Sequence, residues 1–458
     1  MPDTATLAPP TPRPLWKTYF ALLLPMMLTN VLQSSAGTID GIYLGQMIGV
    51  DAIAAVSAFF PVFFFLLAII IGLSTGATVL VGHAWGAGDR VKVRAIAGTA
   101  LAMMVCAGAA IAAVGGIFAG PLMHALGTPP NVVGDATLYA RLMLLGMPVV
   151  FLLWLATSMS RGVGDAVTPL WTLALATMIA LVCTPALIRG WFGLPRLRVA
   201  SPAVSTLIAF AVAMLWTAMR WRRSAHPLAP DVALWHTMRI DPGIARKILR
   251  IGVPSSLQML TMAIAEMVLL GLVNRHGSHA TAAYGAVNQV MSWMQLPAMS
   301  LGITASILTS HALGAGRAER IGRIVRTGLV VNVAVTGLFV AAAYVLAPTI
   351  LGFFLADATV VALALQLLHI VAWSVVVLGL ANVLVGTMRA SGTVFAPTAL
   401  AMFAIVCIEL PVAYWLNARI GMQGIWWSYA LTFVAMLVLQ AGGYGVWGRR
   451  RGSMRRMV

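Results

Sequence analysis

The chain repeats itself at a fixed offset of 228 residues, half of its length of 458. Gly82–Gly88 reads Gly-His-Ala-Trp-Gly-Ala-Gly, and Ser310–Gly316 reads Ser-His-Ala-Leu-Gly-Ala-Gly. A second set returns at the same offset: Arg161, Gly164 and Pro169 recur as Arg389, Gly392 and Pro397. Two separate blocks keep one register, so the chain consists of two related halves. Such a duplication in a chain that is 60% hydrophobic is typical of membrane transporters.

The composition excludes a soluble protein, because charged residues make up 9% of the chain and soluble proteins carry about 25%. The mean hydropathy is +0.94, and successive apolar stretches reach the roughly 20 residues that cross a bilayer as a helix. These stretches lack the period-2 alternation of a membrane barrel, so we expect an all-α integral membrane fold. Twelve transmembrane helices are predicted, over 17–44, 55–81, 95–120, 132–157, 167–190, 201–221, 249–274, 284–309, 324–347, 360–388, 394–417 and 424–447.

The net charge of +17 follows the predicted topology. If both termini are cytoplasmic, 23 of the 29 Lys and Arg residues fall in cytoplasmic segments, as the positive-inside rule requires. The remaining six are Arg141, Arg189, Arg196, Arg198, Arg275 and Arg419. The basic excess therefore indicates membrane topology and contact of the tail with membrane lipids, and no nucleic-acid partner is expected.

Six predicted helices precede the loop 222–248 and six follow it. Both halves therefore enter the membrane in the same orientation, and we expect a pseudo-two-fold axis along the membrane normal with a cavity near the midplane. The expected parts are a disordered cytoplasmic N-terminus (1–14), an N-lobe (15–221), a cytoplasmic inter-lobe loop (222–248), a C-lobe (249–447) and a basic cytoplasmic tail (448–458).

The repeated glycines follow the second helix of each half, where we expect tight turns. A phosphate-binding loop is not indicated, because the Gly-x-x-x-x-Gly-Lys pattern and a preceding strand are both missing. His83 and His311 occupy equivalent places in these turns, and each lacks nearby ligands in the sequence. We expect them to form hydrogen bonds at an interface, and we expect neither a metal site nor a cofactor.

Nine of the twelve acidic residues map to loops, termini or the ends of predicted helices, and three fall well inside predicted helices: Asp40, Glu266 and Glu409. A carboxylate at that depth costs about 2.5–3.5 kcal/mol on insertion scales, so each is a candidate functional residue. Asp40 shares one helix face with Asn30, Gln33 and Gly37. A polar stripe must face protein or a water-filled cavity, and desolvation there favours the protonated carboxyl. Asp40 is therefore predicted to couple transport to protons, and the alternative is a structural Asp that only forms hydrogen bonds.

Glu266 shares a helix face with Ser255, Met259 and Met262, and no cationic partner is evident in the predicted helices. It is either protonated or attracts a cation, and a packing role remains open. Flexible thioethers suit a cavity that accepts several shapes, although ordinary packing explains any single Met equally well. Six of them lie in the seventh and eighth helices: Met259, Met262, Met267, Met291, Met294 and Met299.

With these features the chain resembles the multidrug and toxic compound extrusion (MATE) family. The resemblance rests on the six-plus-six repeat, on Leu24-Pro25 with Thr38-Ile39-Asp40-Gly41, and on the paired Gly-Ala-Gly turns. The elements Arg161–Asp165 and Arg389–Thr393 add to it. It covers roughly residues 15–447.

Within that family the chain is more similar to the DinF branch than to NorM. The stretches Pro254–Gln258, Leu272–Gly277 and Ala282–Gly285 look DinF-like, and Val375–Leu378 lacks the acid that NorM members carry there. The resemblance implies proton-driven export with Asp40 as the protonation site and Tyr139 nearby.

Several relatives place Asn and Asp in the fifth helix, where this chain has Ala180 and Thr184. We therefore expect the hydrogen-bond network around Asp40 to be missing, so that proton and substrate compete for Asp40 directly. The residues expected to line the central cavity are Asn30, Gln33, Gly37, Tyr139, Thr184, Gln258, Met259, Met262, Glu266 and Asn288.

The sequence thus predicts a monomeric, proton-coupled antiporter of the bacterial inner membrane. It would export amphipathic, often cationic drugs and toxins by alternating access. Sodium coupling is one alternative, and a flippase for lipid-linked oligosaccharide is another, although a basic groove for pyrophosphate is not evident in the first half. An enzyme is not expected, because His83 and His311 have no nearby intramembrane acid. A channel fits a paired-lobe repeat less well than alternating access does.

Overall fold

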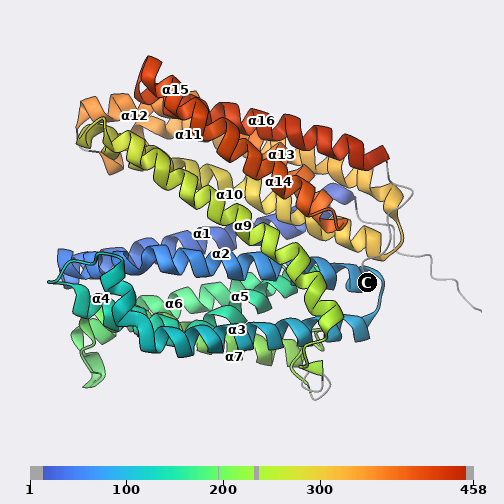
Figure 1. Ribbon diagram of the computed structural model, residues 1–458. Helices are drawn as coiled ribbons and strands as arrows, with labels where there is room; N and C mark the ends of the chain where they lie inside the picture. The colour runs from blue at the N-terminus through green and yellow to red at the C-terminus, as the bar shows by residue number, and fades with distance from the viewer. Residues whose placement is uncertain (1–13, 194, 232–236, 356, 450–458) are drawn as a thin grey trace, which may run out of the picture.

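The computed structural model describes residues 14–193, 195–231, 237–355 and 357–449. The expected N-terminal disorder (residues 1–13) and most of the basic tail lie outside these ranges. The described residues form helices and no strand (Figure 1). The helices are α1 (Leu15–Met47), α2 (Val50–Gly86), α3 (Arg90–Ala125), α4 (Val133–Leu145), α5 (Met147–Gly162), α6 (Val167–Arg189), η1 (Trp191–Gly193), η2 (Arg198–Ala200), α7 (Ser201–Arg223), α9 (Pro242–Asn274), α10 (Ser278–Gly314), η3 (Ala318–Arg320), α11 (Ile321–Phe354), α12 (Ala358–Val371), α13 (Ser374–Ala390), α14 (Phe395–Phe403), η4 (Ala404–Glu409), α15 (Leu410–Ile420) and α16 (Met422–Arg449).

Among the described residues, ten helices are long and apolar enough to cross a membrane, and counting each of two bent pairs as one span brings the number to twelve. The predicted single helices over 132–157 and 360–388 are wrong in this respect. The first is the pair α4 and α5, bent by 50°, and the second is the pair α12 and α13, bent by 40°. Pro148 has no N–H and cannot donate the helical hydrogen bond to the carbonyl of Leu144. The loss of this bond accounts for the break at Gly146.

Capping residues set the helix ends near the repeated turns. Gly88 and Gly316 have φ values of +73° and +71°, as expected for tight turns that only glycine adopts readily. Asp89 begins α3 by accepting the backbone N–H of Lys92 at 2.9 Å. Asp241 caps α9 in the same way, so that helix begins at Pro242, before the predicted start at residue 249.

The eleventh span contains a π-helical segment, Ala404–Glu409, between α14 and α15. Pro411 cannot donate a hydrogen bond to the carbonyl of Cys407, and widening the preceding turn accommodates the lost bond. The widened turn ends at Glu409, one of the three intramembrane acids.

The helices form two groups, α1–α7 and α9–α16, which we call the N-lobe and the C-lobe, and the first half of α9 crosses over to pack against α2 of the N-lobe (Figure 1). One hydrophobic core lies mainly within the N-lobe around Leu80 and Phe151, and a second lies within the C-lobe around Leu269 and Trp426. A smaller cluster around Tyr19 joins the start of α1 to α10 and α11. The two-lobe, all-helical fold predicted from the repeat is thus confirmed.

The lobes contact each other mainly at one end of the molecule. We call the end where α1 begins and α16 ends the terminus side, and the opposite end the far side. The ribbons of the two lobes converge toward the terminus side in Figure 1. Tyr19 donates to the carbonyl of Ile324 at 2.8 Å, and Asn30 donates to Ser300 Oγ at 3.1 Å. Asn30 lies halfway along α1, and the inter-lobe hydrogen bonds among the described residues reach no farther than the middle of the helices.

Candidate functional site

Asp40 lies in α1 next to hydroxyl groups of α6 and α7. Thr184 Oγ1 is 3.3 Å from Asp40 Oδ1 and 3.0 Å from Ser205 Oγ. Ser205 donates in turn to the carbonyl of Ala180 at 3.3 Å. The expectation that the network around Asp40 is missing is therefore wrong, because Thr184 and Ser205 supply a smaller network of hydroxyls in place of an amide and a carboxylate.

Tyr139 of α4 lies close enough to Asp40 for an electrostatic interaction, as the resemblance implied. The ring of Tyr139 packs edge-on against Phe59, with centroids 6.0 Å apart and planes at 74°. Phe59 is buried in the core of the N-lobe, so it holds the tyrosine in place. Asp40 thus has the Thr184 hydroxyl of α6 as a hydrogen-bond donor and the phenol of Tyr139 nearby.

The predicted polar stripe of α1 divides into two parts. Asn30 belongs to the inter-lobe contact, because its amide binds Ser300 of α10. Gln33 and Asp40 are half-buried, and Gly37 is exposed with no atom within 4 Å of the place where a Cβ would lie. The stripe therefore runs from the inter-lobe contact into open space on the far side.

Glu266 of α9 accepts a hydrogen bond from Asn288 Nδ2 of α10 at 2.6 Å. The Glu266 side chain is exposed, and so is Met262, at 47% of its surface. Met259 on the same helix is half-buried. The structure thus brings the predicted residues Glu266 and Asn288 together and fixes the carboxylate at an exposed surface of the C-lobe.

Glu409, at the end of the π-helical segment, lies within range of an electrostatic interaction with Glu266. The Glu409 side chain is only 6% exposed. Tyr284 and Tyr429 share a hydrogen bond of 3.0 Å between their hydroxyls and interact electrostatically with both acids. We did not predict these two tyrosines, although their polar hydroxyls inside the eighth and twelfth helices were a usable signal.

Gln258, predicted to line the cavity, accepts a hydrogen bond from Arg389 Nη2 of α13. The Nε atom of Arg389 is buried and has no partner among the described residues. The predicted site residues therefore fall into an Asp40 group in the N-lobe, a Glu266 group in the C-lobe, and Asn30 and Gln258, which make contacts of their own. The N-lobe thus holds one intramembrane carboxylate, Asp40, and the C-lobe holds two, of which Glu266 is exposed and Glu409 is buried.

Twelve membrane-spanning segments in two repeated lobes, each with an intramembrane carboxylate, define a duplicated membrane transporter. The MatE family model matches the chain twice, over residues 25–186 and 254–415. The chain therefore belongs to the MatE family, the multidrug and toxic compound extrusion transporters.

Comparisons with individual proteins agree with this assignment. The chain is 37% identical over 439 residues to the probable multidrug resistance protein YoeA of Bacillus subtilis, covering 95% of each chain. The fold is similar to that of a mutant of the Vibrio cholerae MATE transporter VcmN, with a TM-score of 0.87, 20% identity, and coverage of 95% of this chain and 97% of the other. A transporter of the MOP superfamily from Pyrococcus furiosus gives a TM-score of 0.85 at 22% identity over 96% of each chain.

These findings confirm the resemblance to the MATE family and a multi-pass membrane protein related to multidrug transporters. Relatives named NorM are 24% and 26% identical over about nine tenths of the chain. Assignment to the DinF branch stays a prediction.

Proposed function

We propose that the protein is a proton-coupled antiporter that exports amphipathic, often cationic organic compounds, with Asp40 as the coupling site. The observation that carries this proposal is the half-buried Asp40, which accepts a hydrogen bond from the Thr184 hydroxyl and has the Tyr139 phenol within electrostatic range. A carboxyl group in such surroundings can take up and release one proton without a further ion. Proton binding on one side of the membrane and release on the other then drives substrate in the opposite direction.

Coupling to protons is favoured over coupling to sodium by the donor set around Asp40. A bound hard cation takes several oxygen ligands that converge on one point. Among the described residues, Asp40 has one side-chain hydrogen-bond partner, the Thr184 hydroxyl, and Ser205 bonds to Thr184 and not to Asp40, so the hydrogen bonds form a chain. One carboxylate at the end of such a chain suits a proton.

Selectivity for cationic compounds is assigned to Glu266. Its carboxylate is exposed and held by Asn288, and it has no basic partner within 4 Å among the described residues. A fixed negative charge beside flexible methionines attracts organic cations of various shapes. Asp40 would then exchange protons while Glu266 recruits substrate.

The terminus side is assigned to the cytoplasm, and the protein to the bacterial plasma membrane, where it would act as a monomer. The positive-inside rule supports this orientation, because 23 of the 29 basic residues fall in segments that the sequence predicts to be cytoplasmic. The bacterial sources of the multidrug relatives support the location.

The placement of the inter-lobe contacts supports a mechanism of alternating access. Because the lobes bind each other on the terminus side, the described state is closed toward the cytoplasm. Export requires a second state in which these contacts open and substrate enters from the cytoplasm.

The proposal is tested with everted membrane vesicles that contain the protein and accumulate a fluorescent cationic dye. A proton gradient and a sodium gradient are imposed in separate experiments. Dye transport should follow the proton gradient and be unchanged by sodium. Transport driven by sodium alone, with protons equilibrated, would contradict the assignment of the coupling ion.

A further inference from the structure

The repeated Gly-His motif of the sequence forms the crossing point of α2 and α10. A Cβ on Gly82 would lie 2.8 Å from Cβ of Ser310, its equivalent in the other half. Two positions related by the 228-residue repeat thus face each other, which places the crossing on the pseudo-two-fold axis. The two copies of the motif meet each other at the terminus side.

The histidines of the motif each reach into the opposite lobe. His83 Nε2 lies 2.6 Å from the carbonyl oxygen of Ala390, the last residue of α13. His311 Nε2 lies 2.7 Å from the carbonyl oxygen of Gly162, the last residue of α5. Gly162 and Ala390 are themselves 228 residues apart, so the two bonds are symmetric partners. This confirms the predicted role of the histidines as interfacial hydrogen-bond formers.

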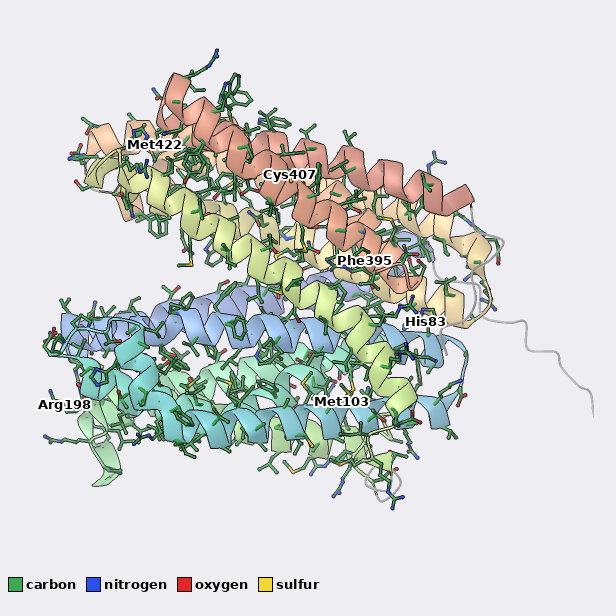
Figure 2. The ribbon with its side chains drawn as sticks, in the orientation of Figure 1. His83, Met103, Arg198, Phe395, Cys407 and Met422 are labelled. Carbon is green, nitrogen blue, oxygen red and sulfur yellow. The ribbon has the colours of Figure 1, made fainter. Side chains whose placement is uncertain are left out.

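Each bond requires the histidine to donate, because a carbonyl oxygen can only accept. His83 lies where the two lobes meet on the terminus side (Figure 2). It is 1% exposed, and its Nδ1 is buried without a partner among the described residues, so the Nε2–H tautomer fits this site. The carbonyls at the end of a helix have no donor within that helix. The histidine therefore satisfies a buried group that would otherwise be left without a partner, at a substantial cost in free energy.

The backbone of the crossing is as close as glycine permits. A Cβ on Gly86 would lie 2.3 Å from the carbonyl oxygen of His311, and a Cβ on Gly314 would lie 2.0 Å from that of His83. In both halves the glycine stands three residues after the histidine, at Gly86 after His83 and at Gly314 after His311. Glycine lets the helices approach, and the approach brings each histidine to its acceptor.

We propose that His83 and His311 form a reciprocal latch that keeps the terminus side of the transporter closed. Both bonds join one lobe to the other, so neither survives when the lobes separate there. The bonds are made in the described state and lost in the state that opens to the cytoplasm. This inference rests on the proposed alternating access. It assigns His83 and His311 as positioning residues that stabilise the state closed on the terminus side.

The latch sets the ratio of the two states. A net hydrogen bond changes an equilibrium by about five-fold, and two independent, symmetric bonds change it by roughly 25-fold. Loss of both donors should therefore raise the ratio of open to closed terminus side by about 25-fold. Loss of one donor should raise it by about five-fold, whichever lobe contributes it.

The test measures distances by electron–electron double resonance on spin-labelled protein in nanodiscs, without an ion gradient. Val91 and Glu319 are exposed equivalents on the terminus side, and Val50 and Ser278 are exposed equivalents on the far side. One pair is changed to Cys at a time after the native Cys106, Cys183 and Cys407 are replaced.

In the double variant His83→Phe, His311→Phe, which keeps a ring but removes the donor, the terminus-side distance should lengthen and the far-side distance should shorten. His83→Gln, His311→Gln should restore the original distribution, because the Gln amide can donate. An unchanged distribution in the Phe variant would overturn the latch. Equal opening in the Phe and Gln variants would also overturn it, since packing and not the hydrogen bond would then hold the closure.

If the double Phe variant does not fold, the single variants His83→Phe and His311→Phe provide a second test, each compared with the matching single Gln variant. Each Phe variant should raise the ratio of open to closed terminus side by about five-fold, and each Gln variant should leave it unchanged. No opening in either Phe variant, or equal opening in its Gln counterpart, would overturn the inference. These distances do not depend on the coupling ion or the substrate, so failure of the dye-transport experiment with intact distance changes would refute the proposed function and leave the latch standing.

Discussion

The exposed carboxylate of Glu266 gives a direct test of substrate recognition. Glu266→Gln keeps the size of the side chain and the contact with Asn288 but removes the negative charge. For a monovalent cation about 7 Å from the carboxylate, Coulomb's law gives an attraction of about 0.6 kcal/mol at the dielectric constant of water. The attraction is about 2.4 kcal/mol at an effective dielectric constant of about 20. Because Glu266 is exposed, the lower half of this interval applies, and about 1 kcal/mol corresponds to roughly a five-fold loss of affinity.

The assay compares KM for a cationic dye and for a neutral compound in the same everted vesicles. We expect KM for the cation to rise about five-fold in Glu266→Gln, and KM for the neutral compound to stay unchanged. Glu319→Gln is the matched control, because it removes the same charge from an exposed acid outside the spans. Equal effects on both compounds, or no effect on the cation, would refute the role of Glu266 in attracting cations.

Two further predictions concern topology and pH. Periplasmic reporter fusions should be active after residues near 50, 128, 195, 278, 357 and 420 and inactive near 88, 163, 235 and 316, and activity at 235 would contradict the six-plus-six layout. Burial lowers the pKa of His226, with Asp165, 3.6 Å away, opposing this effect, so the folded state binds the proton more weakly than the unfolded chain does. The contribution of His226 to stability is therefore present above pH about 6.5 and is lost as pH falls through the lower folded pKa. The melting temperature should fall less between pH 8 and pH 5.5 in His226→Asn than in the natural protein, and an identical fall would show that His226 is not involved.

The repeat was sufficient to predict the fold, because equivalent helices in two halves must pack in equivalent ways. The bends at Gly146 and at the break between α12 and α13 were not predicted, since the apolar runs continue through both. Hydropathy records whether a segment can lie in lipid but does not record where its backbone bends.

The site was predicted in part, for a related reason. Asp40 and Glu266 were identifiable because charge is costly in a membrane wherever it lies. Their partners Thr184 and Asn288 depend on which helices are neighbours, and small hydroxyl and amide groups occur throughout the spans. Compared with the larger side chains of relatives, Thr184 indicates the loss of a hydrogen-bond network. The sequence does not show that its hydroxyl lies 3.3 Å from Asp40 Oδ1.

The contacts of the histidines show the same limit. His83 and His311 were recognised as an equivalent pair, but their acceptors are backbone carbonyls of the opposite lobe. A backbone acceptor leaves no signature in the sequence, so only the crossing of α2 and α10 reveals it.

The central claim, that one proton on Asp40 drives export, is tested most directly by Asp40→Asn in proteoliposomes. The variant keeps the side-chain size but cannot ionise, and Asp135→Asn serves as a control at an exposed acid. Dye transport and the accompanying proton movement are recorded together under an imposed pH gradient. Both should fall to the level of empty liposomes in Asp40→Asn, at unchanged expression and folding, and remain intact in the control. Undiminished proton-driven transport by Asp40→Asn would contradict the account.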